Sequence, residues 1–203
     1  MDLFVTGIDT DSGKTLVSAI LCEALEADYW KPVQAGLPRD ADRVKELVSN
    51  DKTTIHPERY LLQHPMSPHA AARLENVTIS VGDFSRPSTA RDLVIEGAGG
   101  CLVPLNDSAF IIDLAPRLGA AVILVADLYL GSINHTLLTV EALRSRGLTP
   151  LGIIFNGETN AESERIIRHH TGLEVLLHID RAGTVDRQMV KRYAEQYNRT
   201  RSH

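Results

Sequence analysis

A short loop between a predicted strand and a predicted helix constrains the fold more than any other segment. Residues 6–15 read T-G-I-D-T-D-S-G-K-T. The apolar run Leu3–Thr6 comes before it, and Thr15–Ala27 follows with apolar residues at helical spacing. A strand, a turn of small residues and a helix form the setting in which a glycine-rich loop binds phosphate. The sequence therefore predicts an α/β protein with a phosphate-binding loop after its first strand.

The residue types in this loop suit a nucleotide. Backbone N–H groups of the turn and the helix start can converge on an anion, while Lys14 can reach the terminal phosphates. The hydroxyl of Thr15 can ligate Mg²⁺. Five residues separate Gly7 from Gly13, one more than in the standard loop. A tight turn that carries a solvated lysine is the plainer alternative.

Short apolar runs alternate with helical patterns along the rest of the chain, which predicts a mostly parallel sheet with helices on both faces. The fold class that follows is a single-domain, P-loop NTPase-like α/β protein. Further strands are expected at Tyr29–Lys31, Leu93–Glu96, Ala121–Ala126, Leu151–Phe155 and Glu174–Ile179. Further helices are expected after a cap at Asp40 and at His69–Leu74, Asn134–Arg146, Ala161–His170 and Thr184–Arg199.

Length, charge and hydropathy exclude several classes of protein. Domains average roughly 150 residues, so a chain of 203 residues is expected to form one domain and leaves little room for a second. The net charge of −5 argues against nucleic-acid binding through phosphate contacts, and no apolar run approaches the roughly 20 residues that span a bilayer. No signal peptide is recognisable, so a cytoplasmic protein is expected. We expect a single domain over residues 1–203, with a loop-rich insertion over 51–87 that covers the site and a frayed tail over 197–203.

Three other segments fall where strands of an α/β sheet would end, and ligands bind there. Lys31 ends a short strand and is followed by Pro32, although a surface lysine at a turn would look the same. Glu96 ends a buried strand before a glycine-rich stretch, where it needs a metal, a lysine or loop amides as a partner. Asn134 follows a third strand, and a plain helix N-cap is the alternative there.

Together these segments resemble the dethiobiotin synthetase family. The resemblance spans about Leu3 to Asn156 and runs in order through G-I-D-T-D-S-G-K-T, W-K-P-V-Q-A-G, R-D-A-D, S-P-H-A-A-A, I-E-G-A-G-G, L-G-S-I-N-H and G-I-I-F-N. The five-residue spacing in the phosphate loop is what this family shows. The resemblance implies an ATP- and Mg²⁺-dependent cyclo-ligase that makes dethiobiotin from 7,8-diaminononanoate and CO₂, by way of a carbamate and a carbamic–phosphoric anhydride. It also implies a homodimer with sites at the subunit interface.

The resemblance assigns roles to particular residues. Lys31 would be the catalytic lysine and, with Lys14, would bracket the carbamate and the transferring phosphoryl group near Thr10. Mg²⁺ would be held by Thr15, Asp42 and Glu96, with Asp42 preferred over Asp40 on alignment alone. The nucleotide would contact Asp11, Ser12, Gly13, Lys14, Thr15, Leu16, Gly97, Ala98, Gly99 and Asn156. The substrate would contact Thr10, Lys31, Ala35 and, from the neighbouring subunit, Gly131, Ser132, Ile133 and Asn134.

Three positions depart from the family pattern. Ala35 replaces a hydroxyl residue that would touch the substrate, Gly157 replaces an aspartate after Asn156, and Asp180-Arg181 stands where an Ile-Pro segment is usual. The last two departures leave nucleotide preference open. A partitioning-type P-loop ATPase is the main alternative, but its signature lysine is missing between Gly7 and Gly13.

Overall fold

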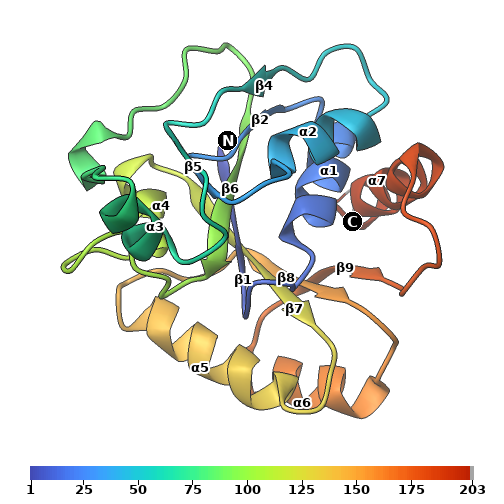
Figure 1. Ribbon diagram of the computed structural model, residues 1–203. Helices are drawn as coiled ribbons and strands as arrows, with labels where there is room; N and C mark the ends of the chain where they lie inside the picture. The colour runs from blue at the N-terminus through green and yellow to red at the C-terminus, as the bar shows by residue number, and fades with distance from the viewer. Residues whose placement is uncertain (202–203) are drawn as a thin grey trace.

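The structure is a computed structural model that describes residues 1–201, and its centre is a seven-stranded sheet (Figure 1). Every pairing in this sheet is parallel, and the strand order is β4-β2-β6-β1-β7-β8-β9. The strands are β1 (Leu3–Gly7), β2 (Asp28–Trp30), β4 (Ile55–His56), β6 (Leu93–Gly100), β7 (Ala121–Asp127), β8 (Gly152–Asn156) and β9 (Val175–Ile179). The predicted α/β class with a parallel sheet is confirmed.

Helices cover both faces of the sheet, as predicted (Figure 1). One face packs against α1 (Lys14–Leu25), α2 (Asp40–Leu47) and α7 (Arg187–Arg201). The other face packs against α3 (Pro68–Leu74), α4 (Leu114–Arg117), α5 (Ser132–Arg144) and α6 (Ala161–Thr171). There are also two short 3₁₀ helices, η1 (Val81–Asp83) and η2 (Ile111–Asp113).

The apolar strands are buried on both sides because consecutive side chains point to opposite faces. In β1, Val5 packs in the cluster beneath α1 and α7, whereas Phe4 packs in the cluster on the opposite face. In β7, Val125 likewise packs on the face covered by α1 and α7, and Leu124 packs on the opposite face. This explains why these strands read as continuous apolar runs without alternation.

The region 51–87 holds more regular structure than predicted. Besides helix α3, which confirms the expected helix, it supplies the edge strand β4 and a strand β5 (Tyr60–Leu62). Strand β5 pairs with β3 (Val33–Ala35) in a separate two-stranded sheet. These strands are two or three residues long, which is too short for a hydrophobic pattern to reveal them.

Two expected boundaries are wrong. Strand β6 continues through Gly100, because Gly100 still pairs with Gly7 of β1, so residues 97–100 are strand and not loop. The tail predicted to fray from Tyr197 belongs to α7 as far as Arg201, and Tyr197 is buried against the core. The final two residues of that predicted tail lie outside the described residues. Across residues 1–201, none of the helices combines the length and apolar character that crossing a membrane requires.

Candidate active site

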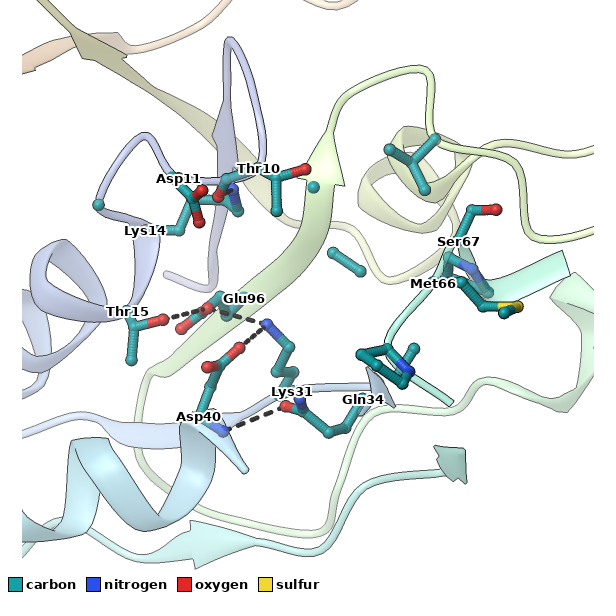
Figure 2. A pocket seen from close by; sticks show the side chains of 17 residues that line it. Thr10, Asp11, Lys14, Thr15, Lys31, Gln34, Asp40, Met66, Ser67 and Glu96 are labelled. Atoms are coloured by element: carbon teal, nitrogen blue, oxygen red, sulfur yellow. Dashed lines mark hydrogen bonds and ion pairs between the residues drawn. The ribbon is translucent and has the colours of Figure 1, made fainter. Parts of the chain in front are cut away.

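A pocket of about 600 Å³ opens at the carboxyl ends of β1, β2 and β6 (Figure 2). Its residues come from the phosphate loop, from the segment after β2, from residues 65–68 and from the end of β6. They are Thr10, Asp11, Gly13, Lys14, Thr15, Lys31, Gln34, Ala35, Asp40, Pro65, Met66, Ser67, Pro68, Glu96, Ala98, Gly99 and Val103. The topology therefore gathers the predicted lysines, the loop and Glu96 around one cavity.

The phosphate loop is closed by its own side chains. Ser12 Oγ accepts a hydrogen bond from Asp9 N (2.8 Å) and donates one to Asp9 O (2.7 Å). Gly13 has a φ of 93°, a conformation that favours glycine, and a Cβ there would lie 2.3 Å from the Asn156 amide nitrogen. Helix α1 begins directly after Gly13.

Lys14 is buried in this loop. Its Nζ donates to Asp9 O (2.8 Å) and Thr10 O (2.7 Å). Burial is the largest influence on the group and lowers the pKa of Lys14 to about 8, although nearby Glu96 opposes that shift. The ammonium is thus poorly solvated, and its hydrogen-bond partners within residues 1–201 are neutral carbonyls, which makes it receptive to an anion.

Lys31 lies between two carboxylates. Its Nζ donates to Glu96 Oε1 (3.0 Å) and to Asp40 Oδ2, and Figure 2 shows both contacts. Burial lowers the pKa of Lys31, but the negative charges of Glu96 and Asp40 raise it more, so the net shift is upward. Lys31 is therefore not the exposed turn lysine of the plainer interpretation, because its side chain is only 5% exposed.

The carboxylate of Glu96 accepts hydrogen bonds from three side chains, one of which is Lys31. Its Oε1 also accepts from Thr15 Oγ1 (2.9 Å), and its Oε2 accepts from Tyr29 Oη (2.9 Å). Gln34 Oε1 accepts from Asp40 N (3.1 Å) and so fixes the start of α2. Neither Tyr29 nor Gln34 was among the predicted site residues. The sequence gives no signal for Tyr29, since only the pairing of β2 with β6 brings it near Glu96.

Asp42, which the resemblance assigns to Mg²⁺, lies outside the pocket. Its carboxylate is half exposed and forms an ion pair with Arg39 (2.6 Å), so it does not line the pocket. Asp40, two residues earlier, lies in the pocket instead. The reason is helical geometry, because residues two apart on α2 project about 200° apart around the axis. Asp40 is also the first residue of α2 and not its cap, which is Arg39.

Asn156 touches the phosphate loop from the end of β8. Its Nδ2 donates to Ser12 O (3.0 Å), so the side chain lies against the turn of the loop. Among the other predicted contacts, Leu16 packs against the core and Gly97 is buried in β6 against Phe4. Asn156, Leu16 and Gly97 do not line the 600 Å³ pocket, whereas Ala98 and Gly99 do.

The segment 131–134 lies apart from this pocket. Gly131 and Ile133 line a second cavity together with residues 128–130 and 158–160. Helix α5 begins at Ser132 with Gly131 as its cap, so Asn134 lies inside the first turn and is not the N-cap. Within one chain, the structure does not bring this segment to Lys31.

The fold and the loop define the class. A glycine-rich loop between β1 and α1, with a buried lysine and a threonine, on a parallel sheet is the arrangement of a P-loop nucleotide-binding protein. A family model described as an AAA domain matches residues 1–189.

Two dethiobiotin synthetases are similar to this chain over nearly its whole length. The ATP-dependent dethiobiotin synthetase BioD of Cytophaga hutchinsonii is 54% identical over 193 residues, covering 94% of each chain. That of Christiangramia forsetii is 48% identical over 198 residues, covering 97% of this chain and 95% of the relative. The chain belongs to the ATP-dependent dethiobiotin synthetase family. The resemblance seen in the motifs is thus confirmed.

Solved structures with the same fold are more distant in sequence. A ParA family ATPase from Chlorobium tepidum is 12% identical, with a TM-score of 0.55, and the match covers 96% of this chain and 98% of that one. The septum site-determining protein MinD from Pyrococcus horikoshii, complexed with Mg-ADP, is 14% identical with a TM-score of 0.59, and the match covers 98% and 90%. At this identity they share the fold alone.

Proposed function

We propose that this pocket catalyses the ATP-dependent formation of dethiobiotin from 7,8-diaminononanoate and CO₂, with release of ADP and phosphate. Family membership supports the reaction. The observation that assigns the reaction to this pocket is the buried ion pair of Lys31 and Glu96 beside Lys14. Two desolvated ammonium groups thus face a cavity that the phosphate loop also lines.

The proposed route needs positioning and charge neutralisation more than proton transfer by the protein. One substrate amine adds to CO₂ and loses a proton to give a carbamate. A carbamate oxygen attacks the γ-phosphorus of ATP, the bond to the β-phosphate oxygen breaks, and a carbamic–phosphoric anhydride forms. The second amine attacks its carbonyl carbon and loses a proton, phosphate leaves, and the cyclic urea closes. Such phosphoryl transfers depend on fixed cations around the transferring group.

The lysines take the main roles in this route. Lys14 binds the terminal phosphates, exchanging Asp9 O and Thr10 O for phosphate oxygens. Lys31 donates hydrogen bonds to the carbamate and to the transferring phosphoryl group, near Thr10. Loop amides from Asp11 to Leu16 bind the phosphates, and Asn156 binds the purine edge from its place against Ser12.

The donor chemistry of the pocket fits Mg²⁺. Carboxylate and hydroxyl oxygens suit this hard cation, and we propose that Thr15, Glu96 and Asp40 hold it, with Asp40 in place of Asp42. In the part of the chain that the structure describes, no three Asp, Glu, His or Cys side chains cluster closely enough to hold a metal, so phosphate oxygens would complete the site. When bound, Mg²⁺ would offset negative charge on the phosphates.

A homodimer is the second part of the proposal. Segment 131–134 does not line the pocket of Lys31 in one chain, so its helix start would serve the neighbouring subunit by binding the substrate carboxylate. Leu130 is fully exposed beside it and Leu138 is 55% exposed on α5, which suits a contact between copies.

The test is an assay with ATP, Mg²⁺, bicarbonate and diaminononanoate that follows both phosphate and dethiobiotin. We expect equal amounts of the two products. Phosphate release that is independent of diaminononanoate would instead favour an ATPase of the partitioning type. Well-folded protein that forms neither product would contradict the proposal.

A further inference from the structure

The buried hydroxyl of Tyr29 contacts Glu96, the carboxylate to which Thr15 and Lys31 also donate hydrogen bonds. We propose that Tyr29 is a positioning residue, which holds Glu96 Oε2 so that Oε1 stays directed at Thr15 and the Mg²⁺ site. This inference rests on the proposed function, because it concerns how Glu96 binds the metal.

The sheet brings the two residues together. Tyr29 of β2 pairs with Val94 of β6, and Glu96 is two residues further along β6, on the same face as Val94. The Tyr29 ring is fully buried among the residues beneath α1, and its hydroxyl reaches forward to Glu96 Oε2 at 2.9 Å. The contact thus joins two paired strands.

The two oxygens of Glu96 have separate partners. Oε1 accepts from Thr15 and Lys31, whereas Tyr29 Oη alone donates to Oε2 among the contacts of residues 1–201. A phenol is neutral near pH 7 and can donate one hydrogen bond, so it does not compete for the metal. Without this donor, Oε2 would be an unsatisfied acceptor in a side chain that is 1% exposed, and the carboxylate would turn to find another.

A partner that orients a metal-binding group changes metal affinity more than it changes the fold. Removing such partners lowers metal affinity by about 10–100-fold. A purely structural role for Tyr29 would instead lower stability and leave the Mg²⁺ dependence unchanged. The metal dependence of nucleotide binding therefore separates the two roles.

The variant is Tyr29→Phe, which removes one oxygen and keeps the ring. Its matched control is Tyr60→Phe, since Tyr60 Oη also donates to a carboxylate, that of Asp83, outside the pocket. ATP binding is measured by calorimetry at increasing Mg²⁺ and also without Mg²⁺. Steady-state kcat is measured over the same Mg²⁺ range.

For Tyr29→Phe we expect the half-saturating Mg²⁺ to rise about 10-fold or more, with kcat recovering at high Mg²⁺ and metal-free ATP binding unchanged. Tyr60→Phe should match the wild type. In a Glu96→Gln background, Tyr29→Phe should have no additional effect on the Mg²⁺ midpoint. An unchanged midpoint in folded Tyr29→Phe, or loss of its fold, overturns the inference. Wild-type protein whose ATP binding ignores Mg²⁺ would overturn the proposed metal site itself.

Discussion

The ammonium group of Lys31 bridges to Asp40, the first residue of α2, at the floor of the pocket. The same group contacts Glu96 of β6, so one lysine joins the start of a helix to the end of a strand. Two carboxylates that would repel each other are thereby kept in one small space.

Lys31→Ala should remove turnover and weaken the fold. The loss of a fixed cation beside the transferring group should lower kcat by about 10²–10³-fold. Breaking a buried pair that leaves Glu96 uncompensated should lower the free energy of unfolding by about 3 kcal/mol. Urea unfolding followed by the fluorescence of Trp30, the only tryptophan, measures the second effect.

Lys52→Ala is the control for that variant. Lys52 forms an exposed ion pair with Glu26, and such pairs contribute about 0–1 kcal/mol. Its loss should leave kcat unchanged. Equal turnover in Lys31→Ala and Lys52→Ala would mean that Lys31 has no part in the reaction.

Asp40→Asn and Asp42→Asn should differ in their Mg²⁺ dependence. Asp40 lines the pocket and Asp42 pairs with Arg39 outside it. We expect the half-activating Mg²⁺ to rise at least about tenfold, or 1.4 kcal/mol, in Asp40→Asn and to stay unchanged in Asp42→Asn. Activity measured across a Mg²⁺ titration decides between them, and the reverse result would restore Asp42 as the ligand.

ATP binding should weaken as the pH rises above about 8. Burial lowers the pKa of Lys14 to about 8 in the free protein, so its ammonium is present below that pH and is lost above it. Phosphate favours the charged form, so binding above pH 8 should take up a proton. Calorimetry in buffers of different ionisation enthalpy measures that uptake.

Lys14→Met supplies the comparison. It should bind ATP weakly at every pH and show no change in proton uptake near pH 8. If the wild type and Lys14→Met take up the same number of protons, another group is responsible.

Gly36→Ala should disturb the wall of the pocket. Gly36 has a φ of 85°, and a Cβ there would lie 2.7 Å from Pro65, which lines the pocket. We expect a higher KM for diaminononanoate and a loss of stability that includes about 1–2 kcal/mol from the left-handed conformation. Gly147 has a φ of 71°, and no atom of the described residues would lie within 4 Å of a Cβ there, so Gly147→Ala should lose only the stability that the backbone conformation costs. A KM that changes equally in both variants would mean that contact with Pro65 is not the cause.

A site shared between subunits predicts complementation. Lys31→Ala and Asn134→Asp should each be inactive, the second because it adds a negative charge where the substrate carboxylate would bind. In a dimer that exchanges subunits at random, mixing them should restore about a quarter of wild-type activity, since half the dimers would hold one intact site. No recovery despite exchange, shown by sedimentation of tagged subunits, would place segment 131–134 outside the site.

Much of this protein follows from local sequence. The apolar runs of β1, β6, β7 and β8 and the loop ahead of α1 predict a parallel α/β sheet with a phosphate loop. Lys14, Lys31 and Glu96 could be chosen because chemistry-bearing residues at the carboxyl ends of strands meet at one edge of the sheet.

Other features depend on contacts between distant segments. The family resemblance favoured Asp42 as the Mg²⁺ ligand, and only the rotation of α2 against β2 shows that Asp40 faces Lys31. Tyr29 looked like an ordinary strand residue, and its contact with Glu96 exists because β2 pairs with β6 across 67 residues of chain. Short strands such as β3 and β5 form because they pair with each other, which no single stretch of sequence encodes.

The sequence by itself therefore determined the fold class, the phosphate loop and the choice of Lys14, Lys31 and Glu96, because hydrophobic periodicity, glycine positions and strand ends are local properties. The tertiary structure decided which carboxylate faces Lys31, what holds Glu96 and which residues close the pocket. Those choices depend on helix rotation and strand register, which are set by packing across the whole domain.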